Sequence, residues 1–307
     1  MAEITEKKNL QFPAALANEM FNAVKGHSTL AKLSGAKPMP FSGVTEFVFA
    51  MDGEAEIVGE GGQKGPGDAA VTPVTVTPIK FIYQHRVSDE FMYLSDEARI
   101  PILQAFADGF AKKIARGMDI AAFHGINPKS GLASNVVNTN HFDAIVTETV
   151  SYAAGDTGAD EALNEAVLKV LDKEREVTGL AMSAVFGNAL SEIKVNGVAQ
   201  YPEFRFGGRP ESFAGRAADI NTTVNKKIAA DTKRDLAIVG DFASAFRWGY
   251  AKQIPLELIE YGNPDGLGDL KAQNQIVLRS EAYIGWGILD AKSFARIVET
   301  VSAGQTS

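Results

Sequence analysis

The histidines of this 307-residue chain are the side chains best suited to bind a metal or transfer a proton, but their spacing forms no known motif. They are His27, His85, His124 and His141. No two of them form a His-x-x-x-His or His-Glu pair, and the chain has no cysteine that would complete a zinc site. We therefore expect no zinc site. We interpret His85, on the apolar face of an expected strand, as a packed histidine or a contact to a neighbouring molecule.

Three other chemical motifs fail on spacing or on context. The glycine-rich residues 59–67 lack the Gly-Lys-Ser/Thr ending of a phosphate-binding loop, and they do not lead from a buried strand into a helix. Asn263, Asp265 and Asp269 suggest a calcium loop, but the ligand spacing is wrong and no glutamate closes the set. The Gly-x-Ser-x-Gly elbow of α/β-hydrolases is absent from the sequence. The sequence thus predicts no catalytic residue, no cofactor and no metal site.

The composition narrows the class of protein. Apolar residues make up 45% of the chain, which is enough for a sizeable core, and no apolar run approaches the length of a membrane span. The N-terminal residues are polar, without the apolar stretch of a signal peptide, and the lack of cysteine fits assembly in a reducing cytoplasm. A net charge of −8 argues against sequence-independent electrostatic binding of nucleic acid, although an acidic protein can enclose nucleic acid without binding it.

The longest expected β structure is a pair of segments, residues 44–58 and 71–87, on either side of a glycine-rich tip. Phe47, Phe49 and Met51 fall on one face of the first segment. The second segment alternates at Ile79, Phe81, Tyr83, His85 and Val87. Because Pro66, Pro73 and Pro78 lack the amide donor that a central strand requires, we expect one long, exposed hairpin.

Such a hairpin is marginally stable alone in water, so it needs another surface to lie on. We expect that surface to belong to a second copy of the protein. The apolar residues expected to be buried beneath the hairpin are Phe47, Phe49, Phe81 and Tyr83. The acidic hairpin residues Glu54, Glu56 and Glu60 are expected to meet basic residues of another subunit, for which the candidates are Lys112, Lys113 and Arg116.

Residues 96–124 give the clearest helix pattern of the chain. Ser95 can cap the start, and Gly125 is placed to end the helix. The apolar stripe consists of Leu103, Phe106, Phe110, Ile114 and Ala121. At about 1.5 Å per residue the helix would span roughly 40 Å, which is long for one domain of this size.

Shorter elements alternate along the rest of the chain without the rhythm of a βαβ fold, so the sequence favours the α+β class. We expect helices at residues 13–24, 160–177, 188–195 and 291–298. We expect strands at residues 180–186, 236–239 and 254–261, and a long strand or strand pair at 274–289.

Several stretches together carry a family resemblance. The hairpin contains Ala55-Glu56-Ile57-Val58-Gly59-Glu60-Gly61 and is followed by Val87-Ser88-Asp89-Glu90-Phe91. The long helix ends in Arg116-Gly-Met-Asp119-Ile-Ala121-Ala-Phe-His-Gly125, before Pro128 and Gly131-Leu132. The C-terminal part contains Arg247-Trp-Gly249, Asn274-Gln-Ile-Val-Leu-Arg279-Ser-Glu281-Ala282 and Asp290-Ala-Lys-Ser-Phe294-Ala295. In this joint order, over nearly the whole chain, the sequence resembles the major capsid proteins of tailed bacteriophages with the Hong Kong 97-type fold.

The resemblance implies an architecture and a function. Residues 1–43 would be an N-terminal arm, 44–88 an extended loop (E-loop), 89–130 and 262–307 a peripheral domain, and 131–261 an axial domain. The protein would be a structural, non-enzymatic component of the virion capsid. It would be assembled in the host cytoplasm as pentamers and hexamers into an icosahedral shell around double-stranded DNA, without sequence-specific DNA binding and without a membrane.

The resemblance also implies partners. Only about 43 residues precede the hairpin, so we expect a separate scaffolding protein or none. We also expect a portal, with or without a decoration protein. Some relatives crosslink a lysine to an asparagine with a glutamate as base. Lys64 lies at the hairpin tip where that lysine would be, but no asparagine or glutamate partner is identifiable.

Two alternatives stay open at the level of sequence. One is an encapsulin, a nanocompartment shell protein on the same fold that holds enzyme cargo. The other is a soluble enzyme, which would bring Arg205, Arg209, Glu211 and Arg216 together in a closed pocket of one subunit.

Overall fold

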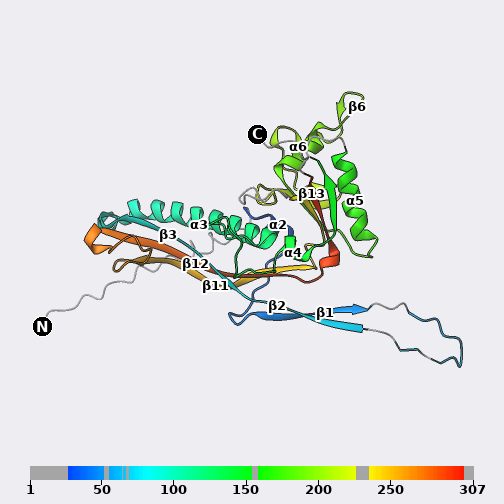
Figure 1. Ribbon diagram of the computed structural model, residues 1–307. Coiled ribbons are helices and arrows are strands. Elements are labelled where there is room, and N and C mark those ends of the chain that lie inside the picture. The colour runs from blue at the N-terminus through cyan, green and yellow to red at the C-terminus, as the bar shows by residue number, and fades with distance from the viewer. Residues whose placement is uncertain are drawn as a thin grey trace.

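The computed structural model describes residues 27–51, 55–63, 65–66, 69–153, 158–225 and 235–300. These residues form an elongated part, a compact part and a hairpin that projects away from both (Figure 1). The elongated part holds a long helix and a three-stranded sheet, and the compact part surrounds a six-stranded sheet. Helices and strands alternate along the chain, which confirms the α+β class.

The long helix is α3, Asp96–His124, with the bounds that the sequence predicts. It ends because Gly125 adopts the left-handed conformation, with φ of 66°, and donates its amide to Ala121 O. A Cβ at this position would lie within 3 Å of the His141 ring, so a side chain is excluded by space as well as by conformation. Ser95 occupies the N-cap position, but its side chain makes no capping hydrogen bond.

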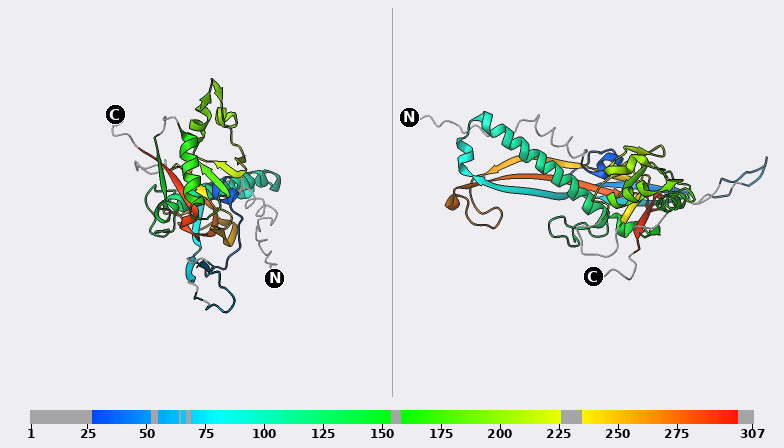
Figure 2. Two further views of the ribbon diagram at one scale, coloured as in Figure 1. Left: turned by 90° about the vertical axis from the view of Figure 1, so that its right-hand side faces the viewer. Right: turned by 90° about the horizontal axis from the view of Figure 1, so that it is seen from above.

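Helix α3 lies along one face of the three-stranded antiparallel sheet (Figures 1 and 2). The strands run in the order β11 (Phe246–Ile259), β12 (Gln275–Ile288) and β3 (Ile79–Ser88). The central strand β12 confirms the expected long strand, whereas the strand expected at 254–261 is only the second half of β11. The core between helix and sheet includes Phe110, Ile114, Met118, Trp248 and Trp286.

The expected hairpin is corrected in its second arm. Strand β1 (Val44–Met51) pairs with β2 (Ala69–Val76), but β3 leaves the hairpin and pairs along its whole length with β12. The chain leaves the ladder at Thr77 and Pro78, and a proline cannot continue it. Residues 71–87 therefore belong to two different sheets, and only residues 44–76 form the projecting hairpin.

The six-stranded sheet of the compact part has the order β4-β13-β10-β5-β9-β8. Its strands are β4 (Thr149–Tyr152), β13 (Phe294–Glu299), β10 (Asp235–Gly240), β5 (Gly179–Met182), β9 (Arg216–Ile220) and β8 (Ser212–Phe213). Helices α5 (Ala159–Leu171) and α6 (Ala184–Glu192) pack with it around a second core that includes Leu163, Phe186 and Ile297. Strand β10 confirms the buried strand expected at 236–239.

Four expected elements of the compact part are corrected. The helix expected at residues 188–195 begins earlier, at Ala184, and ends at Glu192, and Lys194–Val195 form strand β6. The helix expected to reach Val177 ends at Leu171, and the strand expected to reach Phe186 ends at Met182 because the Ser183 side chain caps α6 from Ala184. The last expected helix is one 3₁₀ turn, η4 (Ala291–Ser293), which Asp290 caps and which leads into strand β13. Pairing of β13 with both β10 and β4 outweighs the local helix signal there.

Short elements join these units. They are α2 (Thr29–Leu33), η1 (Asp89–Tyr93), α4 (Phe142–Ile145), β6 (Lys194–Val195), β7 (Val198–Ala199), η2 (Pro202–Gly207) and η3 (Lys271–Gln273). The helix expected at residues 13–24 lies outside the described residues. Among the described residues, no helix is both long and apolar enough to cross a membrane.

Candidate functional site

The projecting hairpin has one face covered by the rest of the chain. Val76 is fully buried at the base, where its side chain and that of Val74 approach Gly287 of β12. Glu46, which is paired with Val74 in the strand register, forms an ion pair with Arg247 of β11. These contacts fix the direction in which the hairpin leaves the body.

The opposite face of the hairpin carries large apolar side chains that nothing in the described chain covers. Phe47 is 63% exposed, Phe49 is 68% exposed and Val71 is 51% exposed. Phe49 pairs with Val71 across the strands, and Phe47 pairs with Pro73, so these side chains share one face. This placement of Phe47 and Phe49 on one face is the one that the sequence alternation predicts. A contiguous apolar face of this kind that is exposed to water indicates an interaction surface.

The tip of the hairpin folds back on itself through one acidic side chain. Glu56 accepts a hydrogen bond from the Gly65 amide at 3.1 Å, and Glu60 is solvent-exposed in the turn before Gly61 and Gly62. Ile57 is completely exposed beside them. The other two tip residues of interest, Glu54 and Lys64, lie outside the described residues.

Two of the predicted contact residues lie elsewhere than under the hairpin. Phe81 and Tyr83 are on β3, and Phe81 packs into the core of its own chain near Trp286, with a ring distance of 6.2 Å. Tyr83 is 40% exposed and its ring lies 6.1 Å from that of Phe106 on α3. The alternation in the sequence correctly predicted a strand at β3. Its apolar face, however, packs on α3 of the same chain and not on a second copy.

The predicted cationic residues lie on the exposed side of α3. Lys112, Lys113 and Arg116 are all solvent-exposed. Arg116 reaches Thr222 Oγ1 at 3.3 Å. Within one chain the structure does not bring these cations to Glu56 or Glu60, so a pairing of the two groups would have to join different copies.

The residues of the enzyme alternative do not form a closed site. Arg205, Arg209 and Glu211 are exposed, and the Arg205 guanidinium lies over the exposed ring of Phe206. Arg216 uses its Nε to donate to Val177 O at 3.2 Å. These side chains lie on surface segments of the compact part rather than around a cavity.

The candidate calcium loop at residues 262–274 is held by an arginine. Arg86 of β3 forms a forked ion pair with Asp265, donates to Gly268 O at 2.8 Å and reaches Gln275 Oε1 at 3.0 Å. The hydrogen bond from Arg86 is the main cause that lowers the pKa of Asp265 to about 2. The Asp265 carboxylate is therefore paired with a cation of the chain itself.

Asp119 is a buried anchor that the sequence analysis did not identify. It lies on α3, fully buried, and accepts hydrogen bonds from Ser28 Oγ at 2.5 Å, Thr29 N at 2.9 Å, Leu30 N at 3.3 Å and Thr223 Oγ1 at 3.0 Å. Burial raises the pKa of Asp119 to about 7, although the four hydrogen bonds act to lower it. The signal in the sequence was an acidic residue flanked by Met118 and Ile120 on the apolar side of a helix.

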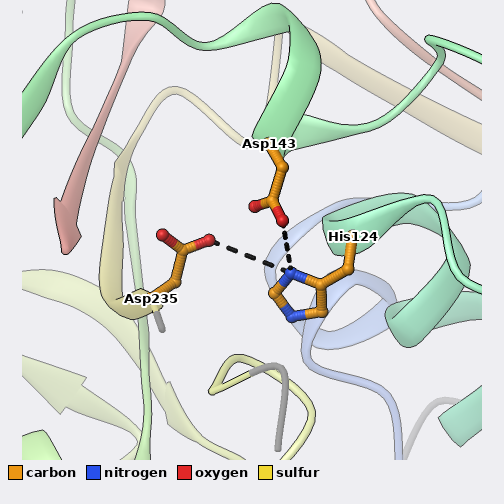
Figure 3. A group of neighbouring side chains, drawn as sticks. All are labelled: His124, Asp143 and Asp235. Carbon is orange, nitrogen blue, oxygen red and sulfur yellow. Dashed lines mark hydrogen bonds and ion pairs between the residues drawn. The ribbon is translucent and has the colours of Figure 1, made fainter. Parts of the chain in front are cut away.

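A second buried polar cluster lies at the junction of the two parts and was also missed (Figure 3). His124, at the end of α3, faces Asp143 of α4 and Asp235 of β10. Burial acts to raise the pKa of Asp143, but hydrogen bonds and the charges of His124 and Arg296 hold it well below its ordinary value. Burial and the nearby charge of Asp143 raise the pKa of Asp235. These residues are far apart in sequence, so no local pattern could reveal them.

Comparison with known proteins connects this architecture to one family. The model of a family described as the phage capsid family matches residues 11–298. The chain is similar to a solved structure from Mycobacterium phage Ogopogo, with 34% identity over 89% of this chain and 92% of that chain and a TM-score of 0.77. It is similar to a structure from Gordonia phage Cozz, with 26% identity over 90% of this chain and 87% of that chain and a TM-score of 0.74.

A more distant likeness concerns the fold alone. A structure described as "Capsid of empty GTA particle computed with C5 symmetry" is 13% identical, covers 90% of each chain and has a TM-score of 0.61. No curated protein matched the chain.

Proposed function

This chain belongs to the phage capsid family, and we propose that its copies close into pentamers and hexamers that build an icosahedral shell around double-stranded DNA. It is a major capsid protein with the Hong Kong 97-type fold, it is a structural protein rather than an enzyme, and its place is the capsid of the virion. The predictions of family, of a non-enzymatic role and of the virion are thereby confirmed.

The observation that carries the proposal is the uncovered apolar face of the hairpin. A two-stranded hairpin that leaves Phe47, Phe49 and Val71 in water gains stability only when that face is buried. A contact from the hairpin of one copy to the body of the next is heterologous, and a heterologous contact closes into a ring when its rotation allows. Slightly different settings of the hairpin would let one sequence serve rings of both sizes.

We assign the subdomains on the same basis. The N-terminal arm is residues 1–43, the peripheral domain is residues 89–130 and 262–307, and the axial domain is residues 131–261. The E-loop was expected over residues 44–88, and its projecting portion is narrowed to 44–76 because β3 pairs with β12. In this assignment α3 is the spine helix of the peripheral domain.

Charged side chains would set the register of the neighbouring copies. Glu56 and Glu60 at the hairpin tip are exposed, as are Lys112, Lys113 and Arg116 on α3. Exposed pairs of this kind contribute about 0–1 kcal/mol each, so they would guide the approach of subunits more than hold them. Glu54 would belong to the same acidic set.

The proposed shell implies further partners, although no particular residue of this chain identifies them. We propose a separate scaffolding protein and a portal, with or without a decoration protein, and DNA that is enclosed without sequence-specific binding. A crosslink through Lys64 is tested by denaturing electrophoresis of mature particles, in which a ladder supports the crosslink and a single monomer band excludes it. The phage sources of the similar structures favour a genome over the enzyme cargo of the encapsulin alternative.

The proposal is tested by the double variant Phe47→Ala/Phe49→Ala. Burying a phenylalanine side chain contributes about 1.5–3 kcal/mol, and these two are about two-thirds exposed in the subunit, so the variant should lose roughly 2–4 kcal/mol per copy on assembly. Because 1.4 kcal/mol is a factor of about ten, the concentration needed to form shells should rise at least tenfold. Sedimentation and negative-stain electron microscopy of the purified chain measure this.

Thr72→Ala is the matched control, since Thr72 is exposed on the opposite face of the same hairpin. The control should assemble as the original chain does, and circular dichroism should show that all three proteins are folded. Deletion of residues 52–70 should likewise abolish shells and leave a folded, soluble subunit. Normal shells from the double variant or from the deletion would contradict the proposal.

A further inference from the structure

The cluster at the junction of the two parts brings one imidazole nitrogen and two carboxylate oxygens together (Figure 3). His124 Nδ1 lies 3.1 Å from Asp143 Oδ2 and 3.9 Å from Asp235 Oδ2. One such atom from each residue lies within 4.8 Å of the others. The three side chains come from α3, α4 and β10, so the fold rather than a local motif assembles them.

A backbone carbonyl fixes the orientation of the His124 ring. Its Nε2 lies 2.9 Å from Thr223 O, and because a carbonyl oxygen only accepts, Nε2 carries a hydrogen and donates it. Nδ1 is therefore the nitrogen presented to the two carboxylates. Histidines that bind metals are commonly oriented in this way, with the second ring nitrogen donating to a carbonyl or carboxylate.

Arg296 orients the two carboxylates from the other side. Its Nη2 lies 3.1 Å from Asp143 Oδ1 and 2.9 Å from Asp235 Oδ1. One oxygen of each carboxylate thus meets the guanidinium, and the Oδ2 atoms turn toward His124. The Asp235 side chain is 1% exposed, and its Oδ2 accepts no hydrogen bond from the described residues. A buried carboxylate oxygen in this position is stabilised only by a proton or a cation.

We propose that this cluster binds one divalent transition-metal ion of the zinc class through His124 Nδ1, Asp143 Oδ2 and Asp235 Oδ2. Ligand atoms about 2.0–2.2 Å from a tetrahedral zinc lie roughly 3.3–3.6 Å apart, so side-chain movements of about 1 Å complete the set. A nitrogen ligand beside two oxygens favours such an ion over calcium or magnesium, which prefer oxygen alone.

The charge and accessibility of the cluster fit one divalent ion. The two carboxylates and the Arg296 guanidinium together carry one net negative charge, so a dication is attracted rather than repelled. The Asp143 side chain is 12% exposed, which gives the ion an entry side and a water a fourth coordination position. His124 and Asp235 close the opposite side.

The ion would tie the end of α3 in the elongated part to β10 in the compact part. This role goes beyond the formation of the shell, because it concerns the junction inside each subunit. An ion that binds only the folded chain raises its stability, and the effect grows with the metal concentration. Each copy would carry the same internal connection.

The test uses the purified full-length chain without a histidine tag, first treated with a chelator. Titration with Co²⁺, followed by visible absorption, should show d–d bands that saturate at one ion per chain, and Zn²⁺ should displace Co²⁺ and abolish the bands. Zn²⁺ titration calorimetry should give the same stoichiometry. This readout on the unaltered chain does not depend on whether a variant folds.

Asp143→Asn and Asp235→Asn keep the size of each side chain and should each weaken metal binding at least tenfold. Asp241→Asn is the matched control, because Asp241 is also half-buried, directly follows β10 and accepts from Thr178 Oγ1 outside the cluster. Absence of saturable Co²⁺ bands and of Zn²⁺ heat up to millimolar metal would overturn the proposal in favour of a shared proton. Equal binding by the original chain and both cluster variants would overturn it in favour of another location.

Discussion

Replacing the buried carboxylate of Asp119 by an amide should destabilise the subunit in a pH-dependent way. Asp119 accepts on both oxygens: Oδ1 from Ser28 Oγ and Leu30 N, and Oδ2 from Thr29 N and Thr223 Oγ1. In Asp119→Asn, the NH₂ group replaces one of the two oxygens. It then faces the backbone N–H of either Thr29 or Leu30, whichever way the amide is oriented. One buried donor is then left without an acceptor, which costs about 1–3 kcal/mol.

The pH dependence follows from the pKa of Asp119. Burial raises that pKa from 3.8 to about 7 in the folded state, so the folded chain binds the proton more tightly than the unfolded chain. The resulting stability is fully present below pH 3.8 and is lost as the pH rises through about 7. The unfolding free energy of the original chain should therefore exceed that of Asp119→Asn by about 1–3 kcal/mol at pH 6. This difference should be smaller by about 1.4 kcal/mol at pH 8.

Urea unfolding followed by tryptophan fluorescence measures this difference. The Trp248 indole donates to Ser34 O at 2.9 Å, directly after α2, so it reports on the segment that Asp119 holds. Asp219→Asn is the control, since Asp219 accepts from Thr29 Oγ1 and Lys32 on the more exposed side of α2 and should contribute about 1 kcal/mol or less. A difference that does not shrink from pH 6 to pH 8 would refute the reasoning, because the four donors would then outweigh burial and keep the carboxylate charged over this whole range.

Three further predictions concern the loop, the sheet and the shell. Arg86→Ala removes the hydrogen bonds that hold the loop of residues 262–274, so limited proteolysis should cut this loop at least tenfold faster. An unchanged cleavage rate would show that Arg86 does not hold the loop. Gly249→Ala should lower the unfolding free energy by about 2 kcal/mol or more in urea titrations. The added Cβ would collide with the backbone oxygen of Lys37, and a loss below about 0.5 kcal/mol would show that the segment around Lys37 adapts. Lys112→Glu should slow shell assembly in light-scattering assays at low salt. At high salt the variant should assemble as fast as the original chain, because exposed charges are screened. An effect that does not depend on salt would argue against charge pairing between subunits.

The sequence by itself determined those helices and strands in which apolar side chains recur with one clear period. The bounds of α3 follow from its apolar stripe and from Gly125, the only residue type that adopts its end conformation without cost. The long alternation of β12 and the shared face of Phe47 and Phe49 were equally readable. The lack of a local catalytic motif pointed away from an enzyme, and the joint order of the motifs pointed to the family.

Tertiary structure alone decided which partner each amphipathic strand found. The alternation in residues 71–87 specifies two faces but not the strand that pairs with them, so it could not reveal that β3 leaves the hairpin for β12. In the same way β13 reads locally as a helix and becomes a strand because β10 and β4 lie on its two sides.

The buried polar clusters were beyond the reach of the sequence for a related reason. Asp119 meets Ser28 and Thr223, and His124 meets Asp143 and Asp235, across separations that carry no periodic signal. The sequence determined which side chains could be charged and which faces were apolar. Only the folded chain decided which charges are removed from water together, because desolvation and hydrogen bonding depend on neighbours that the fold supplies.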